Sequence, residues 1–219
     1  PGPSGYLRTM SPLRTDARFW VLSEALASYA SDADDPPVRD ADTVQAAVAL
    51  VLRGRERLEL LLIKRARSER DPWSGHMALP GGRRDAEDAT LRDTAMRETL
   101  EETGLDLARS GAMLGALDAV APGSVRLPSL TISPFVFGTL ADVTARVASP
   151  EIAEVYWVAL DELRDPAVHG HVDINLPGGE RSFPCYRVVD EVVWGLTYRI
   201  IAQFLERFPD GELARLAAG

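Results

Sequence analysis

The sequence predicts an α/β fold, with a mixed central sheet sandwiched between helices and an additional N-terminal helix. Two β-rich runs, 43–54 and 56–66, are separated by a short polar stretch, which is the pattern of a hairpin. Strong helix formers fill 89–103 and end at Gly104. Because strand-like and helix-like segments alternate along the rest of the chain, one sheet system covered by helices is expected.

The elements on either side of these segments follow from the same local patterns. Apolar residues recur at helical spacing over 11–30, which predicts the N-terminal helix, and the acidic, proline-containing segment that follows predicts a linker. Further strands are expected at 114–121, 130–140 and 153–160, and a short helix at 160–163.

The C-terminal part of the chain is expected to form a hairpin around Gly178 and Gly179, followed by a final amphipathic helix over 191–208. The apolar stripe of that helix is expected to face the core, with a homodimer seam as the alternative. His169 and His171 precede the hairpin in a turn-rich stretch and have no partners at metal-ligand spacing, so a surface loop is predicted there.

Three segments are distinguished along the 219 residues. Residues 1–9 precede the first methionine, Met10, and are interpreted as a cloning remnant. Residues 10–41 are expected to hold the N-terminal helix and its acidic linker, and residues 42–210 the main domain. A domain of that length can bury a core without a disulfide or a structural metal.

The composition excludes several classes of protein. The 33 acidic residues against 24 basic ones give a formal net charge of −9, which argues against binding to a nucleic-acid backbone. No apolar run approaches the roughly 20 residues that a membrane-spanning helix needs, so no membrane partner is expected. Cys185 is the single cysteine, which excludes an internal disulfide and makes a reducing cytoplasm the expected compartment.

Three carboxylates on the helix predicted over 89–103 form the strongest chemical signal. Glu98, Glu101 and Glu102 are spaced i, i+3 and i+4, so they project from one helix face within reach of a common point. Adjacent carboxylates repel one another, and a hard divalent cation would remove that cost. Mg²⁺ prefers oxygen ligands and keeps water and phosphate oxygens in its shell. A solvated acidic helix face is the alternative interpretation.

Residues 79–105 resemble the signature of the Nudix hydrolases, G-x5-E-x7-R-E-U-x-E-E-x-G-U with U aliphatic. The positions that match are Gly82, Arg97, Glu98, Glu101, Glu102, Gly104 and Leu105. The segment departs from the signature at Asp88, which replaces a glutamate, and at Thr99, which occupies an aliphatic position. One additional residue also separates Gly82 from Arg97.

This lengthened form, GGxxDxxD before the helix, is similar to the variant of the coenzyme A diphosphatase branch of the family. A second motif of that branch resembles the sequence at Leu61, Leu62, Arg65, Ala66, Arg70, Gly75, Pro80, Gly81 and Gly82. Ile63 and Leu79 depart from that motif, and one extra residue lies before Gly75. The segment 192–200 resembles the WGLT segment of the same branch.

The resemblance implies hydrolysis of a nucleoside diphosphate linked to another group, with coenzyme A or an acyl derivative as the expected substrate and Mg²⁺ or Mn²⁺ as the cofactor. It assigns metal binding to Glu98, Glu102, Glu101 and the carbonyl of Gly82. Arg97 joins the three glutamates in the expected catalytic set, and its role is to pair with Asp88 and hold the loop to the helix. The expected substrate-binding residues are Arg65, Arg70, Gly81 and Gly82.

Other functions fit the same signature. A Nudix hydrolase of ADP-ribose, dinucleotides or nucleoside triphosphates is one alternative, because the signature specifies the bond that is cleaved better than the groups attached to it. A non-catalytic, nucleotide-binding Nudix regulator is another. Glu151 and Glu154 are candidates for an additional base, with Glu154 expected to be a strand residue, and His76 for a substrate contact or a loop cap.

Overall fold

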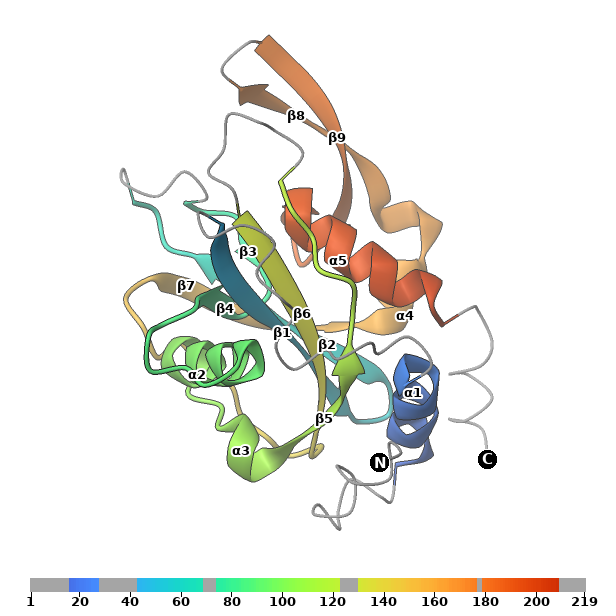
Figure 1. Cartoon of the computed structure of the whole chain (residues 1–219). Helices are drawn as coiled ribbons and strands as arrows, with labels where there is room; N and C mark the ends of the chain where they lie inside the picture. The colour runs from blue at the N-terminus through green and yellow to red at the C-terminus, as the bar shows by residue number, and fades with distance from the viewer. Residues whose placement is uncertain (1–15, 28–42, 69–73, 123–129, 177–178, 209–219) are drawn as a thin grey trace.

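A seven-stranded mixed sheet forms the centre of the computed structural model, which describes residues 16–27, 43–68, 74–122, 130–176 and 179–208 (Figure 1). Its continuous path runs through β3 (Met77–Ala78), β2 (Leu58–Arg65), β1 (Val44–Gly54), β6 (Leu130–Thr139) and β5 (Gly111–Ala116). Two strands lie off this path: β4 (Gly81–Arg83) pairs with β1, and β7 (Ile152–Ala159) pairs with β2. Because β1 and β6 are parallel whereas β1 and β2 are antiparallel, the prediction of a mixed sheet is confirmed.

Helices cover both faces of this sheet. Successive residues of a strand point to opposite faces, and β1 shows the result: Leu50 and Leu52 belong to the core cluster of α1 (Ala17–Ala27) and α5 (Gly195–Glu206), whereas Val51 belongs to the cluster of α2 (Leu91–Thr103). The predicted sandwich with an additional N-terminal helix is therefore confirmed.

Local sequence signals set both ends of α2. The Thr90 side chain accepts a hydrogen bond from the Asp93 N–H at 3.2 Å, and the Asp93 carboxylate accepts one from the Thr90 N–H at 3.0 Å, which is a capping box. At the other end, Gly104 takes a left-handed conformation with φ 67° and ends the helix. These caps confirm the helix predicted over 89–103 to within two residues.

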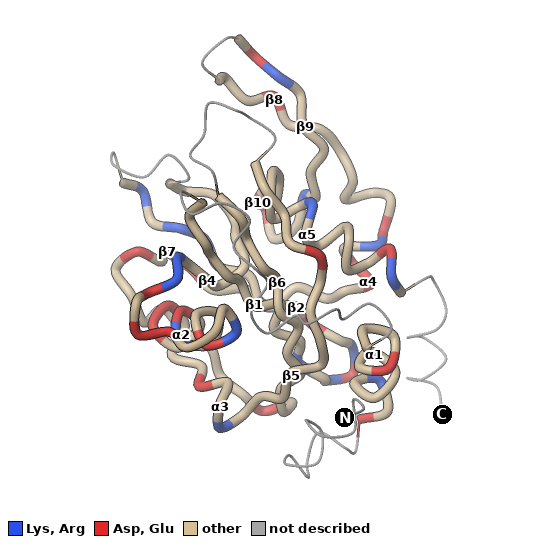
Figure 2. Tube along the Cα trace, in the orientation of Figure 1, with Lys and Arg blue, Asp and Glu red and all other residues tan. Residues whose placement is uncertain are grey.

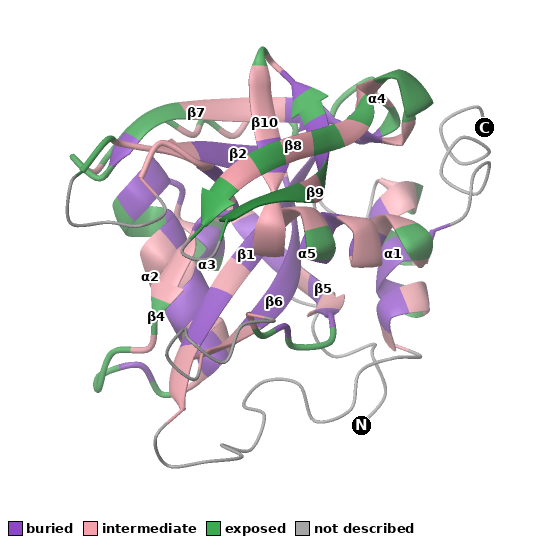
Figure 3. Ribbon diagram, turned by 90° about the horizontal axis from the view of Figure 1, so that it is seen from above, coloured by how far each residue is buried: buried purple, intermediate pink, exposed green. Residues whose placement is uncertain are grey.

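A second sheet consists of β8 (His169–Leu176), β9 (Gly179–Val188) and β10 (Glu191–Trp194), and its β8–β9 hairpin projects beyond the main sheet (Figure 1). The pairing of β8 with β9 confirms the predicted hairpin. The prediction of a surface loop at His169 and His171 is wrong, because both residues lie in β8. Exposed and half-buried residues alternate along this strand (Figure 3), and that period of two belongs to a strand.

The predicted C-terminal helix begins later than expected. Val189 and Asp190 both have positive φ, 49° and 61°, and form a tight two-residue turn that pairs β9 with β10. Residues 191–194 are therefore a strand, and α5 begins at Gly195. The apolar stripe faces the core as expected, since Ile200 and Phe204 are buried.

The remaining elements differ from expectation mainly in their bounds. The strand predicted at 114–121 is β5, which begins earlier, directly after the short helix α3 (Leu107–Ser110). The short helix expected at 160–163 is α4 (Leu160–Arg164), followed by a 3₁₀ turn at Pro166–Val168. The predicted linker, Gly178 and the ends of the helix predicted over 11–30 lie outside the described residues. Within the described residues, no helix has the length and apolar character to cross a membrane.

Candidate active site

The turn of β4 and the helix α2 bring the sequence-predicted carboxylates against the central sheet. β4 pairs with β1 so that Gly82 lies opposite Ala47 and Gly81 opposite Val48. The N–H of Gly81 donates a hydrogen bond of 2.9 Å to Glu102 Oε2. Glu102 is only 5% exposed. The glycine turn therefore holds one carboxylate of α2 directly at the edge of β1.

Both glycines are needed for this close approach. At Gly81, φ is 154°, and a Cβ atom there would lie 2.3 Å from the carbonyl oxygen of Ala47. At Gly82, a Cβ atom would lie 2.4 Å from Glu98 Oε1. Only a residue without a side chain lets the backbone lie this close to a carboxylate and a neighbouring strand.

Arg97 links the loop before α2 to the carboxylates on the helix. Its Nε and Nη2 each donate a hydrogen bond of 3.0 Å to one oxygen of Asp88, which confirms the predicted pair. Its Nη1 donates to Glu98 at 3.0 Å and to Glu101 at 3.1 Å. Asp88 also accepts hydrogen bonds from the Asp85 N–H and the Thr94 hydroxyl, so the loop is tied to the helix at several points.

The surroundings of these groups shift their pKa values in opposite directions. Burial raises the pKa of Glu102 to about 8, and the charge of Glu98 adds to this, whereas the Gly81 N–H and the charge of Arg65 oppose it. Burial likewise raises the pKa of Glu98, against the effect of Arg97. Hydrogen bonds from Arg97 lower the pKa of Asp88 to about 2 despite its burial. The site thus disfavours negative charge at Glu98 and Glu102, which a bound cation would reverse.

The donor set at this position suits a hard divalent cation. Glu98 and Glu102 are one helical turn apart, Glu102 is buried and Glu98 half-buried, and both lie against the glycine turn, whose carbonyl oxygens are ligands of the same kind. In the part of the chain that the structure describes, no three acidic, histidine or cysteine side chains converge on one point. Glu101 is exposed, and it shares the Nη1 of Arg97 with Glu98. Two carboxylates leave room for the water and phosphate oxygens that Mg²⁺ keeps.

The other residues singled out from the sequence have different positions. Arg65, at the end of β2, and Glu151, just before β7, are close enough to Glu102 for their charges to act on its pKa. Arg70 lies outside the described residues. Glu154 is indeed a strand residue, and it accepts hydrogen bonds from the Tyr156 hydroxyl and Lys64. His76 packs edge-on against Trp194, with 5.0 Å between the ring centroids.

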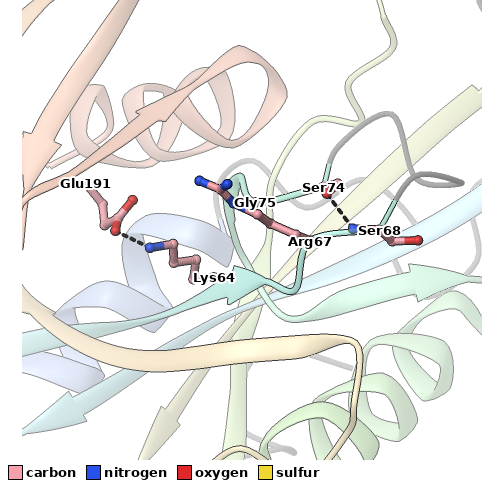
Figure 4. A pocket seen from close by; sticks show the side chains of 6 residues that line it. All are labelled: Lys64, Arg67, Ser68, Ser74, Gly75 and Glu191. Carbon is pink, nitrogen blue, oxygen red and sulfur yellow. Dashed lines mark hydrogen bonds and ion pairs between the residues drawn. The ribbon is translucent and has the colours of Figure 1, made fainter.

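The structure also shows polar residues that the sequence did not single out. A cavity of about 590 Å³ lies at the end of β2, where Lys64 and Arg67 face Glu191 of β10 (Figure 4). The other residues of its lining are Ser68, Ser74 and Gly75. Lys64 forms ion pairs with both Glu191 and Glu154. All of the lining residues except Glu191 lie within the segment 61–82 that resembles the second motif, and Glu191 joins them because β10 packs beside β3.

The glycine turn and the carboxylates of α2 lie on a mixed sheet between helices, within residues 42–175, which match the NUDIX domain. The chain therefore belongs to the Nudix hydrolase family, a class of pyrophosphohydrolases that act on nucleoside diphosphate derivatives. Figure 2 shows how acidic and basic residues gather along the helix α2 of this domain.

Relatives of known sequence agree with this assignment. The chain is 28% identical to the Nudix hydrolase NudL of Photorhabdus laumondii over 188 residues, which cover 85% of this chain and 97% of that protein. It is 30% identical to NudL of Enterobacter sp. over 161 residues, covering 73% and 80%. An uncharacterized protein of Schizosaccharomyces pombe is 39% identical over 119 residues, but these span 53% of this chain and only 36% of that protein.

The solved structures that resemble the chain are more distant. The NUDIX domain of Shewanella oneidensis NrtR in complex with ADP ribose has a TM-score of 0.48 and 18% identity, covering 85% of this chain and 98% of that domain. A Caenorhabditis elegans (C. elegans) Ap4A hydrolase has a TM-score of 0.46 and 19% identity, covering 55% and 83%. Similarities at this level say nothing about the substrate.

Proposed function

We propose that the protein hydrolyses the pyrophosphate bond of coenzyme A or an acyl derivative, with Mg²⁺ or Mn²⁺ bound at Glu98, Glu102 and the carbonyl of Gly82. One observation carries the proposal: the two carboxylates whose charge the fold disfavours are those held against the Gly81–Gly82 turn. A cation there would stabilise the ionised carboxylates and add the positive charge that a pyrophosphate needs. Glu101 is proposed as a further ligand.

The coenzyme A branch is supported by the position of Arg65. This residue belongs to the second motif of that branch, and it ends β2 within electrostatic reach of Glu102. A guanidinium there can bind a phosphate oxygen through two parallel hydrogen bonds. Arg70 and the backbone of Gly81 and Gly82 are the other proposed substrate contacts.

The protein's own residues would position the substrate and the attacking water. Arg97 holds the loop that carries Gly82 in place through Asp88, so that the phosphorus is presented in one orientation. When bound, the divalent cation would neutralise charge on the phosphate oxygens. Arg65 would take up part of the remaining charge, and positioning together with electrostatics would supply most of the rate enhancement.

Glu151 is the candidate for the base that accepts a proton from water. Its carbonyl oxygen accepts a hydrogen bond of 2.7 Å from the N–H of Ala66, which fixes it beside the end of β2. Glu154 is less suited, because Lys64 and Tyr156 already occupy its carboxylate. We expect Glu151→Gln to lower kcat about a hundredfold. Turnover of this variant at the wild-type rate would assign the base elsewhere.

Product analysis by mass spectrometry tests the proposed substrate. The protein is incubated with Mg²⁺ and, separately, coenzyme A, ADP-ribose, NADH, diadenosine polyphosphates and deoxynucleoside triphosphates. We expect phosphopantetheine and adenosine 3′,5′-bisphosphate from coenzyme A at the highest kcat/KM. Faster cleavage of ADP-ribose or of a dinucleotide would replace the proposed substrate while leaving the chemistry in place. Binding of a nucleotide without turnover of any compound would indicate a regulator.

A further inference from the structure

The cavity at the end of β2 is rich in hydrogen-bond donors. Arg67 has no ion pair or hydrogen bond to any residue that the structure describes, and its guanidinium lies between Lys64 and Gly75 (Figure 4). Ser74 accepts a hydrogen bond of 2.7 Å from the Ser68 N–H, which leaves the Ser74 hydroxyl proton free to donate. The lining therefore contains a planar guanidinium, which points toward Lys64 and Glu191, and a hydroxyl beside Ser68 (Figure 4).

Arg67 is the group in the lining that suits an anion. Among the described residues of the lining, Glu191 is the one acidic residue, and its carboxylate is held in an ion pair with Lys64. Arg67 itself is exposed and forms no ion pair with a described residue. An arginine fork matches two oxygens of a phosphate group, and such charge-assisted hydrogen bonds are stronger than neutral ones.

The cavity adjoins the candidate active site through a short, fixed piece of chain. Arg65, whose charge acts on Glu102, is separated from Arg67 by one residue. The N–H of Arg65 donates to the carbonyl of His76 at 3.0 Å, and the N–H of Ala66 donates to the carbonyl of Glu151 at 2.7 Å. The segments that form the wall of the cavity are thus held to those that carry the candidate base.

We propose that Arg67 and Ser74 form a second phosphate subsite, which binds a phosphate monoester of the substrate outside the bond that is cleaved. This inference rests on the proposed function, in which coenzyme A is the substrate: the 3′-phosphate of its ribose is such a group. ADP-ribose and NADH lack it. The cavity would therefore select coenzyme A among nucleotides that share the same pyrophosphate.

The test compares coenzyme A with its 3′-dephospho form in the presence of Mg²⁺. The measured quantity is the preference, defined as kcat/KM for coenzyme A divided by kcat/KM for the dephospho form. We expect Arg67→Ala to lower the preference about tenfold, by raising KM for coenzyme A. Ser74→Ala should lower the preference about threefold, and Arg67→Lys should lower it less than Arg67→Ala does. Arg109→Ala, which removes an exposed arginine on α3, is the matched control and retains the wild-type preference.

The possible outcomes distinguish failure of the second phosphate subsite from failure of the proposed function. If the wild type cleaves coenzyme A but Arg67→Ala and Arg109→Ala have the same preference, the second subsite is refuted and the proposed function stands. If Arg67→Ala raises KM equally for both substrates, the arginine binds the pyrophosphate and the subsite is likewise refuted. If the wild type cleaves neither compound, the proposed function fails and the subsite with it. Thermal unfolding of each variant checks that the fold is retained.

Discussion

Glu98 and Glu102 hold their carboxylates in surroundings that oppose ionisation. The free-energy cost of ionising them there calls for a functional explanation. Burial raises both pKa values, and for Glu102 the hydrogen bond from Gly81 and the charge of Arg65 offset this effect in part. A protein that gained nothing from these charges would be more stable with neutral side chains at the same positions. The arrangement is explained if the two carboxylates act together on a cation.

Glutamine substitutions test that explanation. We expect Glu98→Gln and Glu102→Gln each to lower kcat at least about a hundredfold, which corresponds to about 2.7 kcal/mol of transition-state stabilisation. Neither variant should unfold at a lower temperature in metal-free buffer, because both remove a disfavoured charge. Glu87→Gln, at an exposed position before the helix, is the control. Turnover near the wild-type rate in either variant at saturating Mg²⁺ would refute the metal site.

The pair of Arg97 and Asp88 is expected to contribute to stability as well as activity. Arg97→Ala leaves the buried Asp88 carboxylate without its main donor, and we expect a loss of about 2 kcal/mol in the free energy of unfolding. Because Asp88→Asn removes the same interaction from the other side, the double variant should lose less than the sum of the single variants. Chemical denaturation of the four proteins measures this coupling, and additive losses would show that the two side chains act independently.

The same pair predicts a dependence of stability on pH. The pKa of Asp88 is lowered from its usual value of 3.8 to about 2 in the folded protein. A carboxylate whose pKa is lower in the folded than in the unfolded protein stabilises the fold fully when the pH is above the pKa of the unfolded state. This contribution is lost as the pH falls through the pKa of the folded state. We therefore expect the stability difference between wild type and Asp88→Asn to be constant from pH 7 to pH 5 and to shrink between about pH 4 and pH 2. A difference that grows on acidification would have the wrong sign.

At the scale of elements, the distance between α2 and β4 determines whether the site can form. Gly82→Ala would place a methyl group 2.4 Å from Glu98 Oε1, so the carboxylate or the turn must move. We expect kcat to fall at least about tenfold, since displacement of a catalytic group by about 1 Å has costs of this order or larger. Gly170→Ala is a matched control in β8, where the nearest heavy atom is 3.4 Å from the added carbon. Equal effects of both variants would show that the close approach is unimportant.

The elements that could be predicted from the sequence are those with local end signals. The capping box at Thr90 and the left-handed Gly104 define α2 within the segment itself, and the three glutamates follow once the helix is known. The turn at Val189 and Asp190 carries no glycine, although both residues have positive φ, so the local sequence did not indicate the hairpin of β9 and β10. A short apolar run such as residues 191–194, directly before a helix, has a spacing of apolar residues that fits either a strand or a helix.

At the scale of the whole molecule, long-range pairing is what the sequence could not provide. The parallel register of β1 and β6 joins residues more than eighty positions apart, and it arises from packing on both faces of the sheet. The cavity beside Lys64 has the same origin, because Glu191 reaches it from β10 of the second sheet. The candidate carboxylates could be predicted because one helix carries them, whereas the cavity is formed by segments from different parts of the chain.

Because of the position of β1, the amides of the glycine turn can become exposed to solvent only when the central sheet itself opens. β1 pairs with β2, β4 and β6. On one side of the glycine turn, the N–H of Ala49 in β1 donates a hydrogen bond of 2.8 Å to the carbonyl of Pro80. On the other side, the N–H of Arg84 donates one of 3.0 Å to the carbonyl of Gln45 in β1. The glycine turn is therefore hydrogen-bonded to the strand at both of its ends. In hydrogen exchange, amides of such a unit become accessible together with the strand that holds them. The glycine turn should accordingly exchange as slowly as the core of the protein, in contrast to the mobile loops that carry many active sites.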